Sequence, residues 1–518
     1  MLIRAFAIVA LFLGIAAPAN ALDYDHRVIS WQDSSPLQES PLIYGSNGSP
    51  CTSGWGPGCD SKNGRIDVIN FLPNCDQPAG SDSKVDCIDS IYAEVSGKSV
   101  KGERVANQNG IDDRYSYNAR PEYGIAKASA YEIYKFAGLT HDKGNLFMVY
   151  PWNSKTIVNG VTEDNQYTFL IAPAYQDPMY NCAILHTAND LCWLTGSFTT
   201  DTRFTLNVAF SKAPAGWFSG RVTDPSIKTA DLKDNRVSVS FSGISQSVPS
   251  ITRSFRSNVT SEFNEWNSVA KAIPYLAWDG KHISSGIPFT SDEITVYEKI
   301  VSTVPSFNNA DGLKNVWRID SKPSVNWADS KSDCINSGLI GVVSSNSMTY
   351  ANSIPKWDAA NGSLVYSMAS PHTALGKEFA GRYDLLISEK VGKCLWSLKS
   401  LNPSAEISVV GSSGQKKVVT ASSKIVDGYY KFTISGFTFS SNTVSVKILS
   451  DGSNPIQRAE ASVEPIEIQG PLSDLTSPAS KPATPTNIKK QTIICSKGKI
   501  QKKITSVNPK CPTGYKKK

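Results

Sequence analysis

FTLNVAF, residues 204–210, places its large apolar residues on one face of an extended chain, namely Phe204, Leu206, Val208 and Phe210. Successive side chains of a strand point to opposite faces, so this alternation predicts a β-strand with one buried face. RVSVSF (236–241), YYKFTI (429–434) and TVSVKIL (443–449) show the same period of two. These four stretches predict that the chain is mainly β.

Shorter signals support this fold class. The segment ISVV-GSSGQ-KKVV (407–419) predicts a hairpin around a glycine-bearing loop. Many short alternating runs separated by Gly, Asn and Ser are typical of β-sandwiches. We therefore expect two β-sandwich, Ig-like domains.

Two stretches depart from the strand pattern. TSDEITVYEKIVSTV (290–304) begins with a T-x-x-E capping box and has helical spacing, so it predicts a helix. IAKASAYEIYKF (125–136) fits a helix and a strand almost equally, and both interpretations stay open.

The chain divides by composition into six expected segments. Residues 1–21 have the positive start, apolar run and Ala19-Asn20-Ala21 site of a secretory signal peptide. Residues 466–490 are rich in Pro, Ser and Thr, which predicts an extended linker. The remaining segments are a cysteine-rich β domain at 22–254, a partly helical connector at 255–310, a second β-sandwich at 311–465 and a basic module at 491–518. We expect this module to be a small hairpin through Lys497-Gly498-Lys499 that is closed by a disulfide between Cys495 and Cys511.

All ten cysteines follow the signal peptide, and an even number in an exported chain predicts disulfides. Most successive cysteines are close in sequence, so we expect each to pair with its neighbour, although other pairings stay open. The ten are Cys51, Cys59, Cys75, Cys87, Cys182, Cys192, Cys334, Cys394, Cys495 and Cys511. No C-x2-C or H-x-x-x-H spacing is present, so we expect no metal and no cofactor.

The charge is unevenly distributed. The net charge is +6, but residues 489–518 contain ten lysines and no acidic residue, which leaves −4 for residues 1–488. The basic module is therefore attached to a mildly acidic body. We expect its lysines to contact an anionic cell-wall or envelope polymer, and the candidates are Lys497, Lys499, Lys502, Lys503, Lys510, Lys516, Lys517 and Lys518. Nucleic-acid binding is disfavoured, because the basic charge is confined to a tail without a recognised nucleic-acid-binding fold.

Catalytic motifs are scarce. The chain lacks G-x-S-x-G, H-E-x-x-H, a P-loop and G-x-G-x-x-G. Ser268 and Lys271 match S-x-x-K, but we interpret them as helix surface because no K-T-G accompanies them. The five histidines have no partner at ligand spacing and are expected at the surface or in turns; they are His26, His141, His186, His282 and His372. The catalytic residues of any reaction therefore remain unknown from sequence.

Three tryptophans have positions that suggest a role. Trp193 and Trp396 lie beside Cys192 and Cys394, which favours packing against disulfides. Trp55 lies in the short glycine-rich loop CTSGWGPGC (51–59). It is a candidate for stacking on a sugar or an aromatic partner, with anchoring of its own loop as the alternative.

The tail TIICSKGKIQKKITSVNPKCPTGYKKK (492–518) resembles a lysine-rich, two-cysteine C-terminal module of uncharacterised secreted actinobacterial surface proteins. That module has the pattern TIxCxKGK, KKVT and PKCPxGYKKK, and Ile504 replaces its usual valine here. Three stretches of the body are also similar to such proteins, namely GWFSGRVTDPSI (216–227), FAGRYDLLISEKVGKCLW (379–396) and DGYYKFTISGFTFSSNTVSVK (427–447). The resemblance implies export and surface residence, and it implies no reaction.

These observations favour a secreted, extracellular or cell-wall-associated protein without catalytic activity, retained at the envelope by its cationic tail. A secreted hydrolase acting on polysaccharide or peptide is one alternative, and an adhesin or carbohydrate-binding protein is another. We expect no membrane span after removal of the signal peptide, because no other stretch approaches the roughly 20 apolar residues needed. The ligand, the oligomeric state and the boundary between the β domains stay open.

Overall fold

The computed structural model describes a set of ranges that covers most of the body and part of the tail. They are 26–31, 42–44, 64–77, 84–106, 118–128, 131–181, 191–256, 259–272, 282–285, 292–322, 334, 338–350, 354–396, 404–410, 416–422, 424–439, 442–449, 491–497, 500–506 and 516–517. The chain separates into two compact units, residues 1–454 and 455–518. The expected signal peptide and the expected linker at 466–490 lie outside the described residues.

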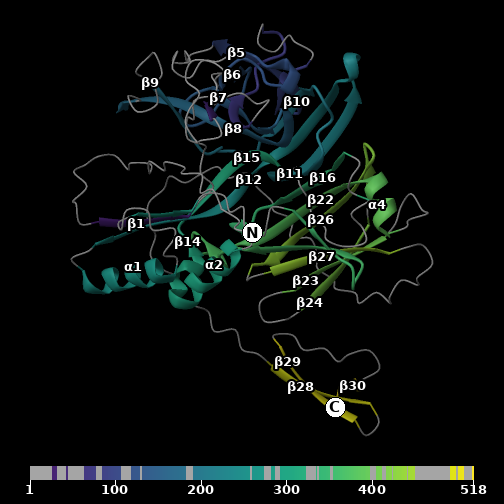
Figure 1. Ribbon diagram of the computed structural model, residues 1–518. Coiled ribbons are helices and arrows are strands. Elements are labelled where there is room, and N and C mark those ends of the chain that lie inside the picture. The colour runs from purple at the N-terminus through teal and green to yellow at the C-terminus, as the bar shows by residue number, and fades with distance from the viewer. Residues whose placement is uncertain are drawn as a thin grey trace. The chain divides into compact units, whose positions relative to one another are not determined.

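The described residues are mainly β-strand, as the alternation predicts (Figure 1). The strands before the first helix are β1 (His26–Trp31), β2 (Leu42–Tyr44), β3 (Arg65–Phe71), β4 (Cys87–Val95), β5 (Lys98–Ala106), β6 (Glu132–Phe136), β7 (Leu146–Val158), β8 (Val161–Asn181), β9 (Leu191–Thr195), β10 (Arg203–Phe210), β11 (Gly216–Asp231) and β12 (Val237–Arg256).

The elements that follow are α1 (Thr260–Ala272), β13 (His282–Ser285), α2 (Asp292–Thr303), β14 (Asn309–Ala310), β15 (Gly312–Lys322), β16 (Leu339–Ser345), β17 (Thr349–Tyr350), β18 (Lys356–Asp358), β19 (Ser363–Ala369), β20 (Thr373–Ala374), β21 (Lys377–Glu378), β22 (Ala380–Ser388), α4 (Glu389–Trp396), β23 (Ser404–Val410), β24 (Lys416–Ser422), β25 (Lys424–Val426), β26 (Tyr429–Thr438) and β27 (Asn442–Leu449). Short 3-10 turns occur at η2 (Pro121–Tyr123), η3 (Lys233–Asn235) and η4 (Pro305–Asn308).

Most of the expected elements form where the sequence places them. FTLNVAF lies in β10, with Phe204, Leu206 and Val208 buried. The hairpin at 407–419 is β23 paired antiparallel with β24. The expected helix at 290–304 is α2, whereas the ambiguous segment 125–136 ends in the strand β6. Tyr134 and Phe136 of β6 pack in a core, which favours the extended form there.

In the first part of the body, the strands β4–β8, β10–β12 and β15 pair into a closed circle. The order is β5–β4–β10–β12–β11–β15–β8–β7–β6 and back to β5, and every pair is antiparallel. Two strands change partner along their length to allow this closure. β5 passes from β4 to β6 at Gly102, where a Cβ atom would lie 2.8 Å from the Phe136 ring. β11 passes from β15 to β12 between Arg221 and Val222, just before a bulge that contains Asp224, whose φ is 53°.

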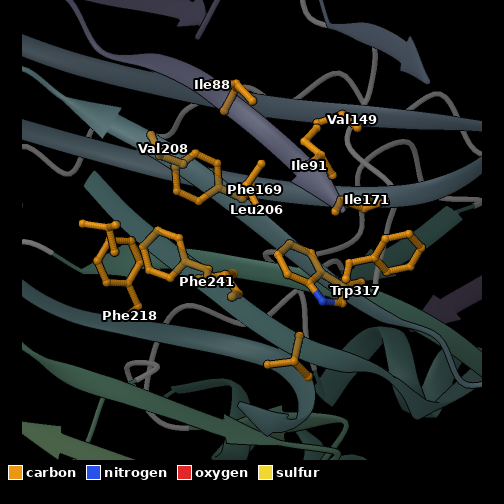
Figure 2. Packing of buried hydrophobic residues seen from close by; sticks show 14 of the residues in the cluster. Ile88, Ile91, Val149, Phe169, Ile171, Leu206, Val208, Phe218, Phe241 and Trp317 are labelled. Atoms are coloured by element: carbon orange, nitrogen blue, oxygen red, sulfur yellow. The ribbon is translucent and has the colours of Figure 1, made fainter. Parts of the chain in front are cut away.

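The interior of this closed circle is a packed apolar core (Figure 2). Figure 2 shows Phe169 of β8, Phe218 of β11, Phe241 of β12 and Trp317 of β15 pointing toward one another. The Phe218 and Phe241 rings lie 4.7 Å apart, and Trp317 donates its indole N–H to the carbonyl of Gly243. Burial of several aromatic side chains, about 150–250 Å² each, makes this core the main stabilising contribution of the first part.

The second part of the body is a two-layer sandwich. β16, β22 and β26 form one layer and β19, β27, β23 and β24 the other. Side chains from both layers share one core, with Tyr383 and Phe432 from the first layer and Tyr366 and Val446 from the second. The two sheets therefore pack over one shared core.

The observed strand pairs cross the expected domain boundaries at residues 254 and 311. β11 pairs with β15 and β16, and β12 and β8 also pair with β15. Trp217 of β11 belongs to the core of the sandwich. The two expected domains therefore share sheets and cores within one unit.

The expected connector packs on this body. α1 and α2 bury Trp266, Tyr297 and Ile300 in a core with Ile251 and Phe255 of β12 (Figure 1). The connector is therefore an integral layer of the fold and not a spacer.

Candidate functional site

The basic tail contains a three-stranded antiparallel sheet made of β28 (Gln491–Lys497), β29 (Ile500–Ser506) and β30 (Lys516–Lys517). β28 lies in the centre, and its antiparallel pairing with β29 runs from Gln491 opposite Ser506 to Lys497 opposite Ile500, as in the expected hairpin. The expected hairpin is therefore confirmed. The side chains of Cys495 and Lys497 are not among those described, and Cys511 lies outside the described residues.

The register brings lysine positions from both outer strands to the same level of the sheet. Cys495 pairs with Lys502 on one side and with Lys517 on the other, while Ser496 pairs with Lys516. Neighbouring strands lie about 4.8 Å apart, so the Cα atoms of Lys502 and Lys517 are separated by about 10 Å across β28. Lysines that are 15 positions apart in sequence are thus held at a short, fixed spacing.

The other lysines of the candidate set have a less defined position. Lys503 pairs with Ile494 in the sheet, and Lys497 ends β28 opposite Ile500. Lys499, Lys510 and Lys518 lie outside the described residues. Residues 489–518 contain no acidic side chain that could neutralise these charges from within the sequence. The tail sheet therefore carries lysine positions that no acidic residue of its own segment can neutralise.

The body contains a buried ionic network that sequence analysis missed. Lys155 of β7 places its Nζ 3.4 Å from Asp86 Oδ2 and donates a hydrogen bond of 2.6 Å to the carbonyl of Gly124. Asp86 also accepts hydrogen bonds from the Tyr167 hydroxyl and from the backbone N–H and hydroxyl of Ser211. Burial alone would raise the pKa of Asp86, but Lys155 and these hydrogen bonds outweigh it and lower the pKa. Asp86 and Lys155 are 2% and 3% exposed, so this network supports structure and cannot reach a substrate.

A second carboxylate lies nearer the surface. Glu132 of β6 accepts hydrogen bonds from Asn74, Gln77 and Arg104, the last at 3.3 Å. The Tyr134 hydroxyl lies 3.3 Å from Glu132 and donates a closer bond of 2.6 Å to Asn74. Burial raises the pKa of Glu132, and its partners offset only part of that rise.

This cluster holds the loop at residues 72–77 against β6. The nearby carboxylate of Asp76, in the same loop, also contributes to the raised pKa of Glu132.

The other residues that the sequence offers as catalytic candidates have local hydrogen-bond partners or lie at the surface. The Ser268 hydroxyl donates to the carbonyl of Asn264 within α1, and Lys271 is exposed, in agreement with a helix surface. His141 lies in a turn, but its ring is buried against Phe147 with Nε2 2.8 Å from the carbonyl of Leu146. His372 is exposed, as expected.

Other expected histidine and metal features are only partly described. The side chains of His26 and His282, and all of His186, lie outside the description. Within the described ranges, no group of three or more His, Cys, Asp or Glu side chains is arranged to hold a metal.

Two disulfides are present in the described residues, Cys75–Cys87 and Cys334–Cys394. Both join successive cysteines, as expected. The side chains of Cys51, Cys59, Cys182, Cys192, Cys495 and Cys511 are not described, and the same holds for Trp55 and Trp193. Trp396 is partly buried, packs edge-on against Trp357, and donates to the carbonyl of Gly362.

The alternation of β7 carried a signal for the buried ion pair. Asn153, Lys155 and Ile157 are alternate residues of PWNSKTIV and so lie on the same face of the strand, and all three are buried. A lysine on the buried face of a strand predicts a buried anionic partner. No comparable local signal marks Glu132, whose partners come from a loop 55–58 residues earlier and from β5.

In the part of the chain that the structure describes, no helix is both long and apolar enough to cross a membrane. No protein-family model matches the chain. A search of the curated proteins finds no relative either.

Proposed function

We propose that this chain is a secreted, non-catalytic surface protein that is retained at the cell envelope by the cationic sheet β28–β29–β30. The observation that carries the proposal is the register of that sheet. It sets Lys502 and Lys517 on either side of Cys495, while Lys516 pairs with Ser496 at the next position, which belongs to the opposite face of the sheet.

Lysine positions at a fixed backbone spacing suit a ligand with regularly spaced negative charges. Anionic wall polymers and envelope phosphates have that chemistry. Each lysine near an anionic membrane surface contributes about 1 kcal/mol, so three lysines contribute about 3 kcal/mol. That corresponds to a roughly 100-fold difference in affinity.

Two features of the chain support this role. The sheet belongs to a compact unit, 455–518, that is distinct from the body at 1–454. The net charge of residues 1–488 is −4, so the positive charge resides in the tail. The proposal assigns attachment to the tail and the exposed function to the body. The Ig-like character of the body's sandwich remains a finer prediction within this proposal.

The test is a salt-titrated sedimentation assay of the mature chain on isolated cell walls. The variant Lys502→Gln/Lys516→Gln/Lys517→Gln should bind roughly 100-fold more weakly at low salt. A matched control removes three exposed lysines of the body, Lys98, Lys101 and Lys135. The control should bind like the unaltered chain. Equal loss of binding in both variants would show that net charge, and not the tail sheet, governs attachment.

A further inference from the structure

The disulfide Cys75–Cys87 lies beside a guanidinium group. Arg236, which follows η3, places Nη2 3.0 Å from the Sγ atom of Cys87. The same nitrogen also donates to the carbonyls of Val85 and Ala209, at 3.2 Å and 3.3 Å. The positive charge is therefore held against one specific sulfur of the disulfide.

This arginine has no anionic partner in the part of the chain that is described. No carboxylate lies within ion-pair distance of it, and its Nε atom is buried without a hydrogen-bond partner. A partly buried guanidinium is normally paired with an anion, because desolvation of an unpaired charge is costly. A thiolate on Cys87 would supply that anion at the distance already present.

The two cysteines differ in exposure. Cys87 is 0% exposed, whereas Cys75 is partly exposed at the loop that precedes β4. Thiol–disulfide exchange depends on which sulfur is accessible, and it is faster when the departing sulfur leaves as a stabilised thiolate. A neighbouring arginine lowers the pKa of a thiol and so stabilises the thiolate. The accessibility of Cys75 and the charge beside Cys87 therefore both favour attack on Cys75 with Cys87 as the leaving thiolate.

We propose that Cys75–Cys87 is a site of reversible exchange with a low-molecular-weight thiol. The incoming thiolate attacks Cys75 Sγ, and a new S–S bond forms there. The bond between Cys75 and Cys87 breaks, and its electron pair remains on Cys87 as a thiolate beside Arg236. Attack by that thiolate on Cys75 reverses the step, expels the small thiol and restores the native disulfide.

The fold around this site retains other links when the disulfide opens. Cys75 N–H donates to the carbonyl of Ile88, and Ile88 N–H donates to that of Pro73. Asn74 and Gln77 also hold Glu132. These hydrogen bonds keep the loop next to β4, so the Cys87 thiolate stays within reach for reclosure.

The other described disulfide provides an internal control. Cys334 is buried and Cys394 is exposed, so Cys334–Cys394 has a similar asymmetry of access. In the described residues, no arginine or lysine contacts either of its sulfurs, and the adjacent Lys393 pairs with Glu389. The two disulfides thus differ in the feature on which the proposal rests.

The experiment exposes the mature chain to excess glutathione, traps free thiols with N-ethylmaleimide and maps both labels by peptide mass spectrometry. We expect glutathione on Cys75 and maleimide on Cys87, with Cys75–Cys87 opening faster than Cys334–Cys394. Arg236→Gln should slow the opening of Cys75–Cys87 roughly tenfold, because the leaving thiolate loses its cation. Arg236→Lys keeps the charge and should stay closer to the unaltered chain.

A change of less than twofold in Arg236→Gln, or an equal change at both disulfides, would overturn the proposal. If Arg236→Gln does not fold, the unaltered chain decides the question through the position of the label. Glutathione found mainly on Cys87, or equally on both cysteines, contradicts a Cys87 leaving group stabilised by Arg236.

Discussion

The ammonium group of Lys155 is buried, and Asp86 is the carboxylate that balances its charge. Removal of one member of a buried ion pair leaves an uncompensated charge, which typically costs about 3–5 kcal/mol. We expect Asp86→Asn to lower the free energy of unfolding by about that amount, as measured by urea denaturation. Lys228→Met, which breaks the exposed pair with Asp427, should cost less than about 1 kcal/mol. Equal costs in the two variants would contradict a structural role for the buried pair.

The pKa of Asp86 is lowered in the folded chain, so its contribution to stability has a defined pH dependence. The contribution is fully present above the usual pKa of 3.8 and is lost as the pH falls through the lower folded value. The stability difference between the unaltered chain and Asp86→Asn should therefore shrink below pH 3.8, which acid titration of the two unfolding free energies measures.

Glu132 should behave in the opposite sense, because burial raises its pKa above the usual 4.5. Its contribution is fully present below 4.5 and is lost as the pH rises through the higher folded value. Relative to Glu132→Gln, the unaltered chain should lose stability as the pH rises from 4.5. A difference between the two chains that stays constant with pH, in denaturation series on both, would count against the raised pKa.

At the scale of elements, two-residue turns show how local chemistry closes the hairpins. Asn159-Gly160 joins β7 to β8 with positive φ angles of 49° and 79°, which is the preferred Asn-Gly turn. Leu375-Gly376 joins β20 to β21 with φ angles of 51° and 74°, and Leu375 is 59% exposed. A leucine in this left-handed conformation is strained, because its Cβ approaches the following carbonyl.

We predict that Leu375→Asn raises the free energy of unfolding by about 0.5–1 kcal/mol, because asparagine tolerates the left-handed region. Asn159→Leu is the reciprocal change and should lower it by a similar amount. Thermal denaturation of both variants measures the effect. A stabilising Asn159→Leu would contradict this account of the turns.

Strand periodicity was the most informative property of the sequence at this scale. It located β10, β26 and β27, which have buried residues on one face, and the β23–β24 hairpin. The same reasoning could not locate the partners of β11 and β12. Each of these long strands changes partner along its length, and pairing with β15 is a non-local property that no short window of sequence contains.

At the scale of the whole molecule, β15 links segments that composition alone separates. It pairs with β8, β11 and β12, so an isolated fragment 22–254 would leave three strands without their neighbour and would expose the face that holds Trp217. We predict that residues 22–254 expressed alone do not form a stable domain, whereas residues 22–454 unfold in one cooperative transition. Circular dichroism and calorimetry distinguish these outcomes. A sharp, native-like transition for 22–254 would contradict the shared core.

The candidate site in the tail was more accessible to sequence reasoning than the body. Lysines and cysteines at fixed spacing predicted a basic hairpin, and β28 and β29 form it. The sequence alone did not show that β30 adds a third strand and brings Lys516 and Lys517 beside β28. The pairing of β30 with β28 is a non-local contact, so no local motif predicts its register.

The central claim, retention at the envelope by the cationic tail, is tested most directly by fractionation of cells that secrete the full-length chain or a chain ending at residue 454. The full-length protein should sediment with the envelope and be released by high salt, and the truncated protein should appear in the medium. The same distribution of both proteins, or retention of the full-length chain that salt does not reverse, would contradict attachment by the charge of β28–β29–β30.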